Sequence, residues 1–243
     1  MDWDYSRHYA RFHSDTPEHD ANLKALFHRW LGPHLPKDKN IPILDVGCGR
    51  GYALGWLREL GYSHLTGIDT DAGQVAFAQG RGLDVQRTED SVVYLNSRPS
   101  SCDFLLLMDV LEHQPREADR TLLEAIRHTL RPGGQLLCTV PNANSPLANH
   151  WRYLDYTHHT SFTYESLEFV LTQAGFHVNG IRPLEFVAGP RLLFWPPARH
   201  TLRWWLLQLS RLQPRLACLG ELGWHDGWRI PLSPNLLALA VRD

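Results

Sequence analysis

The feature that most constrains this chain is the stretch at residues 41–51, IPILDVGCGRG. An apolar, β-prone run ends there in glycines at alternate positions, and a helical pattern follows directly. Glycine is required where the backbone takes a positive φ in a sharp turn or approaches a ligand closely. The stretch therefore predicts a strand, a tight turn and a helix around a bound ligand, with five candidate contacts: Asp45, Gly47, Cys48, Gly49 and Gly51.

Two kinds of ligand site have glycine loops of this type. A dinucleotide fingerprint has the pattern GxGxxG and places a pyrophosphate on the helix N-terminus. Here the glycines follow GxGxG, and Asp45 precedes them at the end of the predicted strand. This arrangement resembles motif I of the class I S-adenosylmethionine (SAM) methyltransferases, whose ligand carries a sulfonium and an amino acid instead of phosphates. Asp45 is then able to receive a cationic group.

Further polar residues follow the next two predicted strands. The strand at 65–68 ends at Asp69 and Thr70, about 20 residues beyond the glycine loop, where a carboxylate accepts the ribose hydroxyls of a nucleoside. A short strand then leads to Asp90 and Ser91. In the methyltransferases an acidic residue at this point meets the adenine amino group, while its other possible role is to cap the helix that follows.

A nearly continuous apolar run at 102–108 predicts a central parallel strand that is covered on both faces. Met108 and Asp109 stand at its end, where open α/β sheets bind ligands. A helix is predicted at 117–130. It stops at the turn RPGG, and QLLCTVPN forms the next strand.

Five motifs now stand in order: ILDVGCGRG, GIDTD, TED, DFLLLMDVLEH and LRPGGQLLCTVPN. They resemble the class I SAM methyltransferases, particularly the branch that includes ubiquinone-biosynthesis O-methyltransferases. The resemblance implies an α/β fold with a doubly wound, Rossmann-like, mostly parallel seven-stranded sheet, N-terminal helices and an aromatic, basic insertion before the last strand. It implies SAM as cofactor and S-adenosylhomocysteine as product. Tyr9 lies in a segment that in related enzymes folds over SAM, unless it simply packs on the sheet.

Length and composition predict one domain. A chain of 243 residues that is 43% hydrophobic can bury one sizeable core. We therefore expect a single methyltransferase domain over residues 1–243. Its parts are an N-terminal helical cap (1–35), a SAM-binding core (40–183), a helical insertion or lid (184–233) and the last strand (234–243).

Charge and cysteine usage exclude several classes of protein. The formal charge of −2 argues against general nucleic-acid binding, which requires a basic footprint. The four cysteines form no CxxC pair, so reduced thiols are expected. The N-terminus reads neither as a signal peptide nor as an anchor, and no apolar run approaches the roughly 20 residues of a spanning helix. These features predict a cytoplasmic protein.

Methylation of a hydroxyl requires removal of its proton as the new bond forms. The candidate bases are His113, and His158 and His159 of the segment WRYLDYTHHTSFTYESL. The residues Asp109-x-x-Glu112-His113 are also similar to the ExxEH signature of metal-dependent relatives, with His158 as a further ligand. Such a set suits Zn²⁺, Mn²⁺ or Fe²⁺ better than Mg²⁺. A metal-free histidine base is favoured, with a divalent metal and purely structural histidines as alternatives.

The insertion is unusual in charge. Between Val187 and Leu219 it contains five arginines and no Asp or Glu. Leucines and tryptophans at helical spacing predict an amphipathic helix with solvated arginines. Residues 190–217 can then lie as a peripheral element on the inner, anionic face of a membrane, pack on the sheet or in a homodimer contact, or form a lid over the acceptor.

The segment at 151–163 resembles, more loosely, methyltransferases of bacterial surface-polysaccharide biosynthesis, which act on sugars, nucleotide-sugars or lipid-linked glycans. Asp155 and Tyr156 can bond sugar hydroxyls, and Trp151 can stack on a pyranose. We therefore expect O-methylation of a sugar or glycan hydroxyl. The alternatives are a small phenolic or quinone-like acceptor, for which the insertion supplies an apolar pocket, and a protein that binds SAM without turnover.

Overall fold

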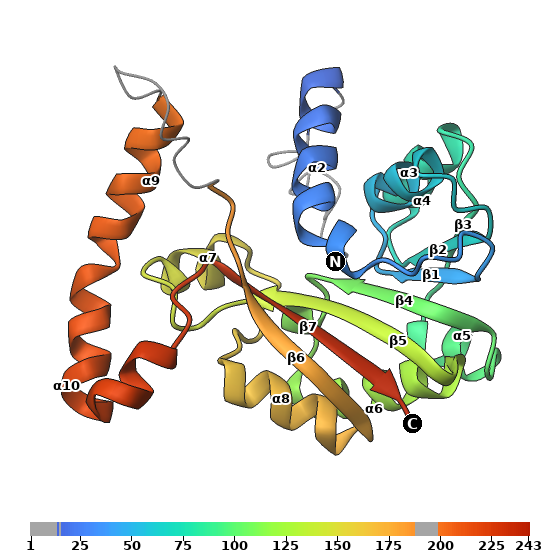
Figure 1. Cartoon of the computed structure of the whole chain (residues 1–243). Coiled ribbons are helices and arrows are strands. Elements are labelled where there is room, and N and C mark those ends of the chain that lie inside the picture. Colours follow the sequence, from blue (N-terminus) through green and yellow to red (C-terminus); the bar gives the residue numbers. More distant parts are fainter. Residues whose placement is uncertain (1–13, 15, 188–198) are drawn as a thin grey trace.

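The computed structural model describes residue 14 and residues 16–187 and 199–243. Seven strands form one sheet in the order β3-β2-β1-β4-β5-β7-β6 (Figure 1). The strands are β1 (Ile43–Val46), β2 (Leu65–Asp69), β3 (Val85–Arg87), β4 (Cys102–Met108), β5 (Leu130–Pro141), β6 (Phe176–Leu184) and β7 (Asn235–Arg242). The first five pair in parallel, while β7 is antiparallel to both of its neighbours. The predicted mostly parallel sheet is confirmed.

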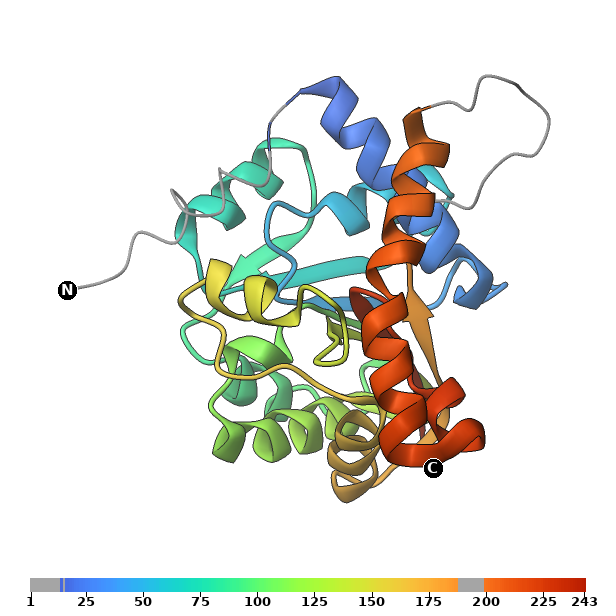
Figure 2. The same cartoon turned by 90° about the vertical axis from the view of Figure 1, so that its left-hand side faces the viewer.

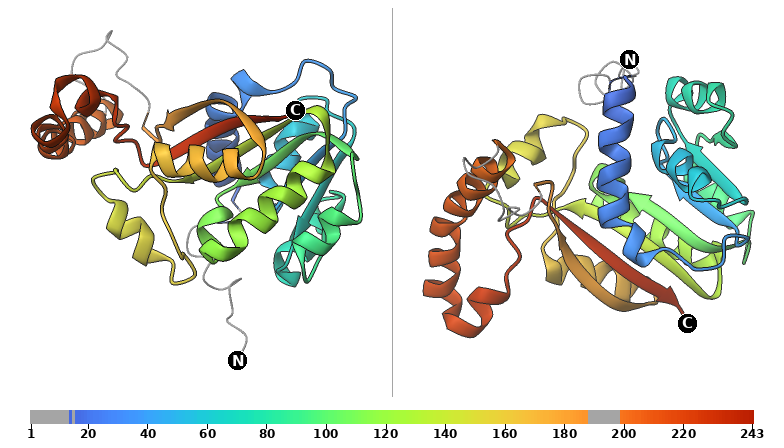
Figure 3. Two further views of the ribbon diagram at one scale, coloured as in Figure 1. Left: turned by 90° about the horizontal axis from the view of Figure 1, so that it is seen from below. Right: turned by 45° about the horizontal axis from the view of Figure 1, so that its top comes forward.

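Helices cover both faces of this sheet. They are α2 (Pro17–Trp30), α3 (Tyr52–Glu59), α4 (Ala72–Gly80), α5 (Ser91–Asn96), α6 (Arg116–Thr129), α7 (Ala148–Leu154) and α8 (Tyr164–Gln173), with the short 3₁₀ turns η1 (Gly32–His34) and η2 (Leu111–His113). Helices α2 to α4 lie on one face, and α5, α6 and α8 lie on the other (Figures 1 and 3). Tyr9 and the rest of residues 1–13 are outside the described residues.

Alternate side chains of the central strand β4 pack in two hydrophobic cores, one on each face of the sheet. Phe104 and Leu106 of β4 pack in the cluster of α2 and α3 with Trp56, whereas Leu105 and Leu107 pack against α6 and α8. All four are fully buried, as expected of a parallel strand covered on both sides. The strand order reverses between β1 and β4, which is where open α/β sheets bind their ligands.

The turn RPGG at 131–134 differs from the prediction. Helix α6 does end just before it, but β5 already begins at Leu130, which pairs with Cys102. The next pair is Phe104 with Gln135, so the register shifts and the four turn residues form an irregularity within the strand. Gly133 takes a φ of +76° there, a conformation that costs glycine little.

In its described part, the insertion forms two helices, the second of them kinked at Gly223, instead of the single amphipathic helix predicted. They are α9 (Arg199–Ser210) and α10 (Leu212–Arg229), and together we call them the arm. Proline at 214 explains the break, because it has no N–H to donate to the carbonyl of Ser210 and is tolerated only in the first turn of a new helix. The arm lies along one side of the molecule (Figures 1 and 2). Within the described ranges, no helix has the length and apolarity needed to span a bilayer.

Candidate functional site

The glycine loop after β1 has the conformation predicted for it. Gly47 and Gly51 have φ angles of +71° and +70°. A Cβ at Gly47 would lie 2.5 Å from the Val110 side chain, and one at Gly51 would lie 2.5 Å from Leu83. Glycine is therefore required at both positions by backbone conformation and by the close packing of neighbouring side chains.

Asp69 fastens this loop to the end of β2. One carboxylate oxygen accepts from the backbone N–H of Gly49 at 2.8 Å, and the other accepts from the N–H of Asp71 at 2.9 Å. Burial raises the pKa of the Asp69 carboxyl, although these hydrogen bonds act in the opposite direction. Thr70 beside it is exposed. Asp69 thus stands at the tip of the strand, next to the loop, as the sequence predicted.

Asp45 is the buried acid of the site. Its side chain is 1% exposed, and neither carboxylate oxygen has a hydrogen-bond partner in the part of the chain that the structure describes. Desolvation, with a smaller contribution from Asp69, raises the pKa of Asp45 to about 7. Burial also raises the pKa of the Cys48 thiol. An unpartnered buried carboxyl is costly unless it is protonated or receives a donor or cation.

Asp90 has the capping role that the sequence left open. Its carboxylate accepts from the backbone N–H groups of Val92 and Val93 at 2.8 and 3.1 Å, so it begins α5. The side chain is exposed, and Ser91 is the first residue of the helix. Capping leaves the other carboxylate oxygen to a ligand, so the adenine role of this residue stays a prediction.

The end of β4 carries a strained backbone. Asp109 has a φ of +52°, which is uncommon for a residue other than glycine. Its backbone N–H donates to Thr139, and its carboxylate accepts from the Thr139 hydroxyl at 3.1 Å and from the Asn235 amide at 2.9 Å. Solvent reaches part of Asp109, but the surrounding protein raises its carboxyl pKa by desolvation. Half-buried Met108 precedes it. Such strain persists only where neighbours hold it, most often at functional sites.

His113 is held by two residues from a distant loop. Its Nδ1 lies 2.7 Å from the Thr157 hydroxyl, and that hydroxyl lies 2.6 Å from a carboxylate oxygen of Asp155. Burial would raise the pKa of Asp155, but the hydrogen bonds from the Thr157 side chain and backbone hold it below its usual value. The ring of His158 meets that of His113 edge to face, with centroids 4.6 Å apart.

The predicted metal set is only partly assembled. Among the described residues, Glu112, His113 and His158 offer ligand atoms within 4.8 Å of one another, and Asp109 is not in this group. Glu112 is 1% exposed, and its Oε2 has no hydrogen-bond partner there. The exposed His159 lies outside the group as well, and its backbone N–H donates to the Glu112 carbonyl.

Several residues of this region were missed from sequence. Thr157 and Thr139 orient His113 and Asp109, and Asn142 after β5 donates to the carbonyls of Pro231 and Ser233 at 2.9 and 2.8 Å. The one available signal was local: Thr157 directly precedes His158 in a segment already singled out. We call the residues at the carboxyl ends of β1, β2 and β4, together with the loop at 155–158, the strand-end site.

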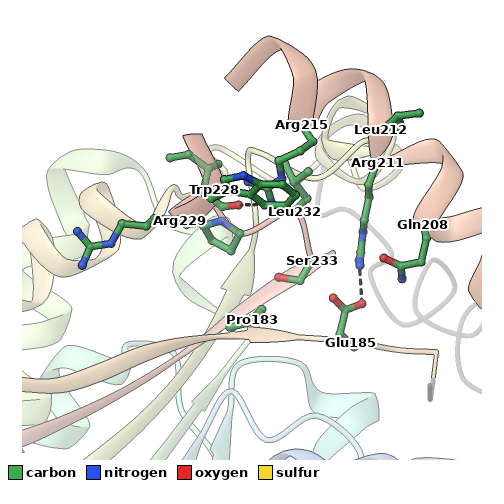
Figure 4. Close-up of a pocket in the computed structure, with 12 residues that line it drawn as sticks. Pro183, Glu185, Gln208, Arg211, Leu212, Arg215, Trp228, Arg229, Leu232 and Ser233 are labelled. Carbon is green, nitrogen blue, oxygen red and sulfur yellow. Dashed lines mark hydrogen bonds and ion pairs between the residues drawn. The ribbon is translucent and has the colours of Figure 1, made fainter. Parts of the chain in front are cut away.

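A cavity of about 500 Å³ lies elsewhere, between the arm and the ends of β6 and β7 (Figure 4). Arg211 reaches across it to Glu185 at 2.8 Å, and Arg215 and Trp228 also line it. None of the residues predicted from sequence to bind cofactor or to act in catalysis is part of its lining. The cavity is therefore not the predicted cofactor site.

The chain is similar in sequence to known methyltransferases. Residues 13–179 match a family model described as Methyltransferase domain. A tRNA U34 carboxymethyltransferase from Idiomarina loihiensis is 33% identical over 116 residues, which are 44% of this chain and 35% of that protein. A ubiquinone biosynthesis O-methyltransferase from Cereibacter sphaeroides is 29% identical over 126 residues, 50% of this chain and 49% of that protein. The chain thus spans half or less of the length of these curated relatives.

The crystal structure of a SAM-dependent methyltransferase from Archaeoglobus fulgidus superposes with a TM-score of 0.68, covering 98% of this chain and 100% of that one at 22% identity. The seven-stranded sheet with helices on both faces is the Rossmann-like fold of the class I methyltransferases. Because the family model covers more than half of the chain, the chain belongs to the methyltransferase-domain family, and SAM is its cofactor.

The residues present fit this cofactor. The unpartnered buried carboxyl of Asp45 matches a ligand that carries an ammonium group. Asp69 would hold the ribose hydroxyls from the tip of β2, beside the glycine loop that it already orders. The rest of the predicted cofactor set follows the ends of β2, β3 and β4: Thr70, Asp90, Ser91, Met108 and Asp109.

Proposed function

We propose that this chain transfers the methyl group of SAM to a hydroxyl of a small ring-shaped acceptor, with His113 as the general base. The observation that carries the proposal is the chain of hydrogen bonds from His113 through Thr157 to Asp155, with distances of 2.7 and 2.6 Å. It resembles the way in which catalytic bases are oriented by a third group.

The direction of these hydrogen bonds fixes the histidine tautomer. The lowered pKa of Asp155 keeps its carboxylate ionised, so the Thr157 hydroxyl donates to it. The Thr157 oxygen then accepts a hydrogen bond from the Nδ1–H of His113. The lone pair of the neutral ring is thereby placed on Nε2, the nitrogen that would take the acceptor proton.

When bound, SAM supplies a methyl group on a sulfonium that departs as the neutral thioether of S-adenosylhomocysteine. The residues of the chain do the rest: Asp45 and Asp69 fix the two ends of the nucleoside, and His113 Nε2 takes the hydroxyl proton as oxygen bonds to carbon. Holding acceptor and methyl in near-attack geometry supplies much of the rate in such a displacement. His158, packed on the His113 ring, limits how that ring turns.

A phenolic or quinone-like acceptor has the better support. One relative is named a ubiquinone biosynthesis O-methyltransferase, and a phenolic hydroxyl gives up its proton more readily than an alcohol does. A sugar hydroxyl is the second candidate, favoured by the exposed aromatic side chains on and after α7, which are Trp151, Tyr153 and Tyr156. Aromatic faces of this kind can stack on a sugar ring as well as on a quinone.

The test measures S-adenosylhomocysteine formation with catechols and hydroxylated benzoates, and in parallel with UDP-hexoses and methyl glycosides. We expect turnover with the phenolic panel. His113→Ala is expected to lower kcat by about 100-fold or more, with unchanged affinity for S-adenosylhomocysteine. His177→Ala, on an exposed position of β6, is the matched control.

Turnover of the sugar panel alone would move the acceptor to the second class. Wild-type turnover in the His113→Ala variant would remove the histidine from its role. Cofactor binding without turnover on either panel would leave a protein that binds SAM but transfers nothing from it, and the proposed function would fail.

A further inference from the structure

The arm exposes more large apolar surface than the other described elements of the chain. Nine of its leucine and tryptophan side chains have at least half of their surface exposed. They are Leu202, Trp205, Leu206, Leu209, Leu212, Leu216, Leu222, Trp224 and Trp228. Soluble proteins rarely leave so large an apolar patch open unless something covers it.

These side chains follow the helix period. In α9, Leu202, Trp205, Leu206 and Leu209 are spaced by three, one and three residues, so they form one stripe along the helix. Leu212 and Leu216 are spaced by four in the first turns of α10. From 202 to 216 these side chains therefore form a stripe presented by regular helices, although Leu212, like Trp228, also lines the cavity between the arm and the body.

The body-facing side is fixed by charged groups. Arg211 pairs with Glu185 at 2.8 Å, and its side chain is only 13% exposed. Arg215 donates to the carbonyls of Gly227 and Ile230. Arg211 therefore holds the arm to the body, whereas Arg215 ties the start of α10 to its own C-terminal end. The sequence had predicted solvated arginines, and these two are not solvated in that way. Arg203 is exposed beside the stripe and makes no ion pair with any residue that the structure describes.

The arm stands at the same end of the sheet as the strand-end site. It enters from the end of β6 and returns into the start of β7, beside the end of β5. Asn142, directly after β5, donates to the carbonyls of Pro231 and Ser233 in the returning loop. A surface that binds the arm is thereby held near the place where an acceptor must enter.

We propose that the exposed stripe of the arm binds the interface of an anionic lipid membrane, with its helices lying in the plane of that surface. Leucines enter the acyl boundary, and the indoles of Trp205 and Trp224 suit the level of the headgroups, because they combine an apolar ring with an N–H donor. This role goes beyond the proposed methyl transfer, and it brings the strand-end site to an acceptor dissolved in the bilayer.

Charge favours a membrane over a second copy of the chain. From residue 186 to residue 220 the sequence contains no acidic residue. The arm as a whole has five arginines and two acidic residues, Glu221 and Asp226, so two arms packed together would gather excess positive charge. An anionic lipid surface supplies the missing negative charge, and each arginine near it is worth about a fivefold gain in binding.

The test is co-sedimentation of the full chain with vesicles of pure phosphatidylcholine and with vesicles that contain about one third phosphatidylglycerol. We expect the wild type to partition onto the anionic vesicles, with a partition coefficient at least tenfold higher than that of Leu209→Glu. For Arg203→Gln the partition coefficient should fall about fivefold on anionic vesicles and stay unchanged on neutral ones. Phe169→Glu on α8 is the matched control, because Phe169 is 63% and Leu209 65% exposed. It should bind as the wild type does.

Affinity for S-adenosylhomocysteine, measured on every variant, reports that the domain is folded whether or not methyl transfer is found. Equal partition of the wild type and Leu209→Glu, or no partition of the wild type, would overturn the proposal. So would a wild-type dimer in sedimentation velocity, without vesicles, that Leu209→Glu converts to a monomer, because the stripe would then bind a second copy.

Discussion

The strand-end site and the arm differ in how their side chains are held: polar groups are fixed by hydrogen bonds in the first, and large apolar groups are exposed in the second. In the strand-end site Asp69, Asp109 and His113 are each held by hydrogen bonds to groups far away in sequence. In the arm many large side chains are exposed, and one arginine, Arg211, pairs with Glu185 of the body. By our proposals, the first region fixes the atoms of a small polar ligand, and the second presents a broad apolar surface to a membrane.

The largest effect that separates the two regions is expected for Asp69→Ala. The variant lacks the carboxylate that orders the glycine loop. By our proposal, that carboxylate also makes two charge-assisted hydrogen bonds to the ribose. Affinity for S-adenosylhomocysteine should fall about 100-fold in titration calorimetry. Leu209→Glu should leave that affinity unchanged. Equal affinity of the two variants for S-adenosylhomocysteine would contradict the assignment of cofactor binding to the strand-end site alone.

A smaller effect is expected for Asp45→Asn. In the ligand-free protein the pKa of Asp45 is raised from 3.8 to about 7, so between these values the folded state binds more protons than the unfolded state. This carboxyl therefore makes stability fall as pH rises from about 4 to 7. Asparagine removes that dependence. At pH 8 the free energy of unfolding of the variant should therefore exceed that of the wild type by roughly 2–4 kcal/mol.

Urea unfolding of ligand-free wild type and Asp45→Asn at pH 4 and pH 8 measures this difference. The comparison isolates Asp45, since burial raises the pKa of other carboxyls too. The same variant should bind S-adenosylhomocysteine about tenfold more weakly, because it offers the ammonium group no charge. An equal pH dependence in both proteins would contradict the buried, unpartnered state of this carboxyl.

The smallest effect, less than about twofold, is expected for metal removal. Asp109, the fourth predicted ligand, lies outside the group of Glu112, His113 and His158, and its carboxylate bonds Thr139 and Asn235 instead. Turnover after dialysis against EDTA should therefore match the untreated enzyme. Loss of turnover that Mn²⁺ or Zn²⁺ restores would instead assign a metal to Glu112, His113 and His158.

The parts of the fold that could be predicted are those with a local cause. An apolar run predicted β4 with its correct bounds, and glycines at alternate positions predicted the turn after β1. The turn at 131–134 was misjudged because pairing with β4 continues on both sides of it. The break at Arg211 had a local cause, the proline at 214, but leucine periodicity across it favoured a single helix.

The site could be predicted only in part for the same reason. Acids at strand tips follow from strand assignment, so the positions of Asp45 and Asp69 beside the glycine loop could be predicted, while their binding roles stay predictions. The partners that orient the chemistry lie far away in sequence: Thr157 is 44 residues from His113, and Asn235 is 126 residues from Asp109. Nothing in one sequence marks such pairs, because they depend on how loops meet after the sheet has formed.

The central claim is that one nucleoside lies across the ends of β1 and β2. A crystal structure of the chain grown with S-adenosylhomocysteine tests it most directly. The account predicts the ribose hydroxyls on the Asp69 carboxylate and the amino group of the ligand on the Asp45 side. Ligand bound instead in the cavity beside Arg211 and Trp228, or a strand-end site that stays empty at saturating ligand, would contradict it.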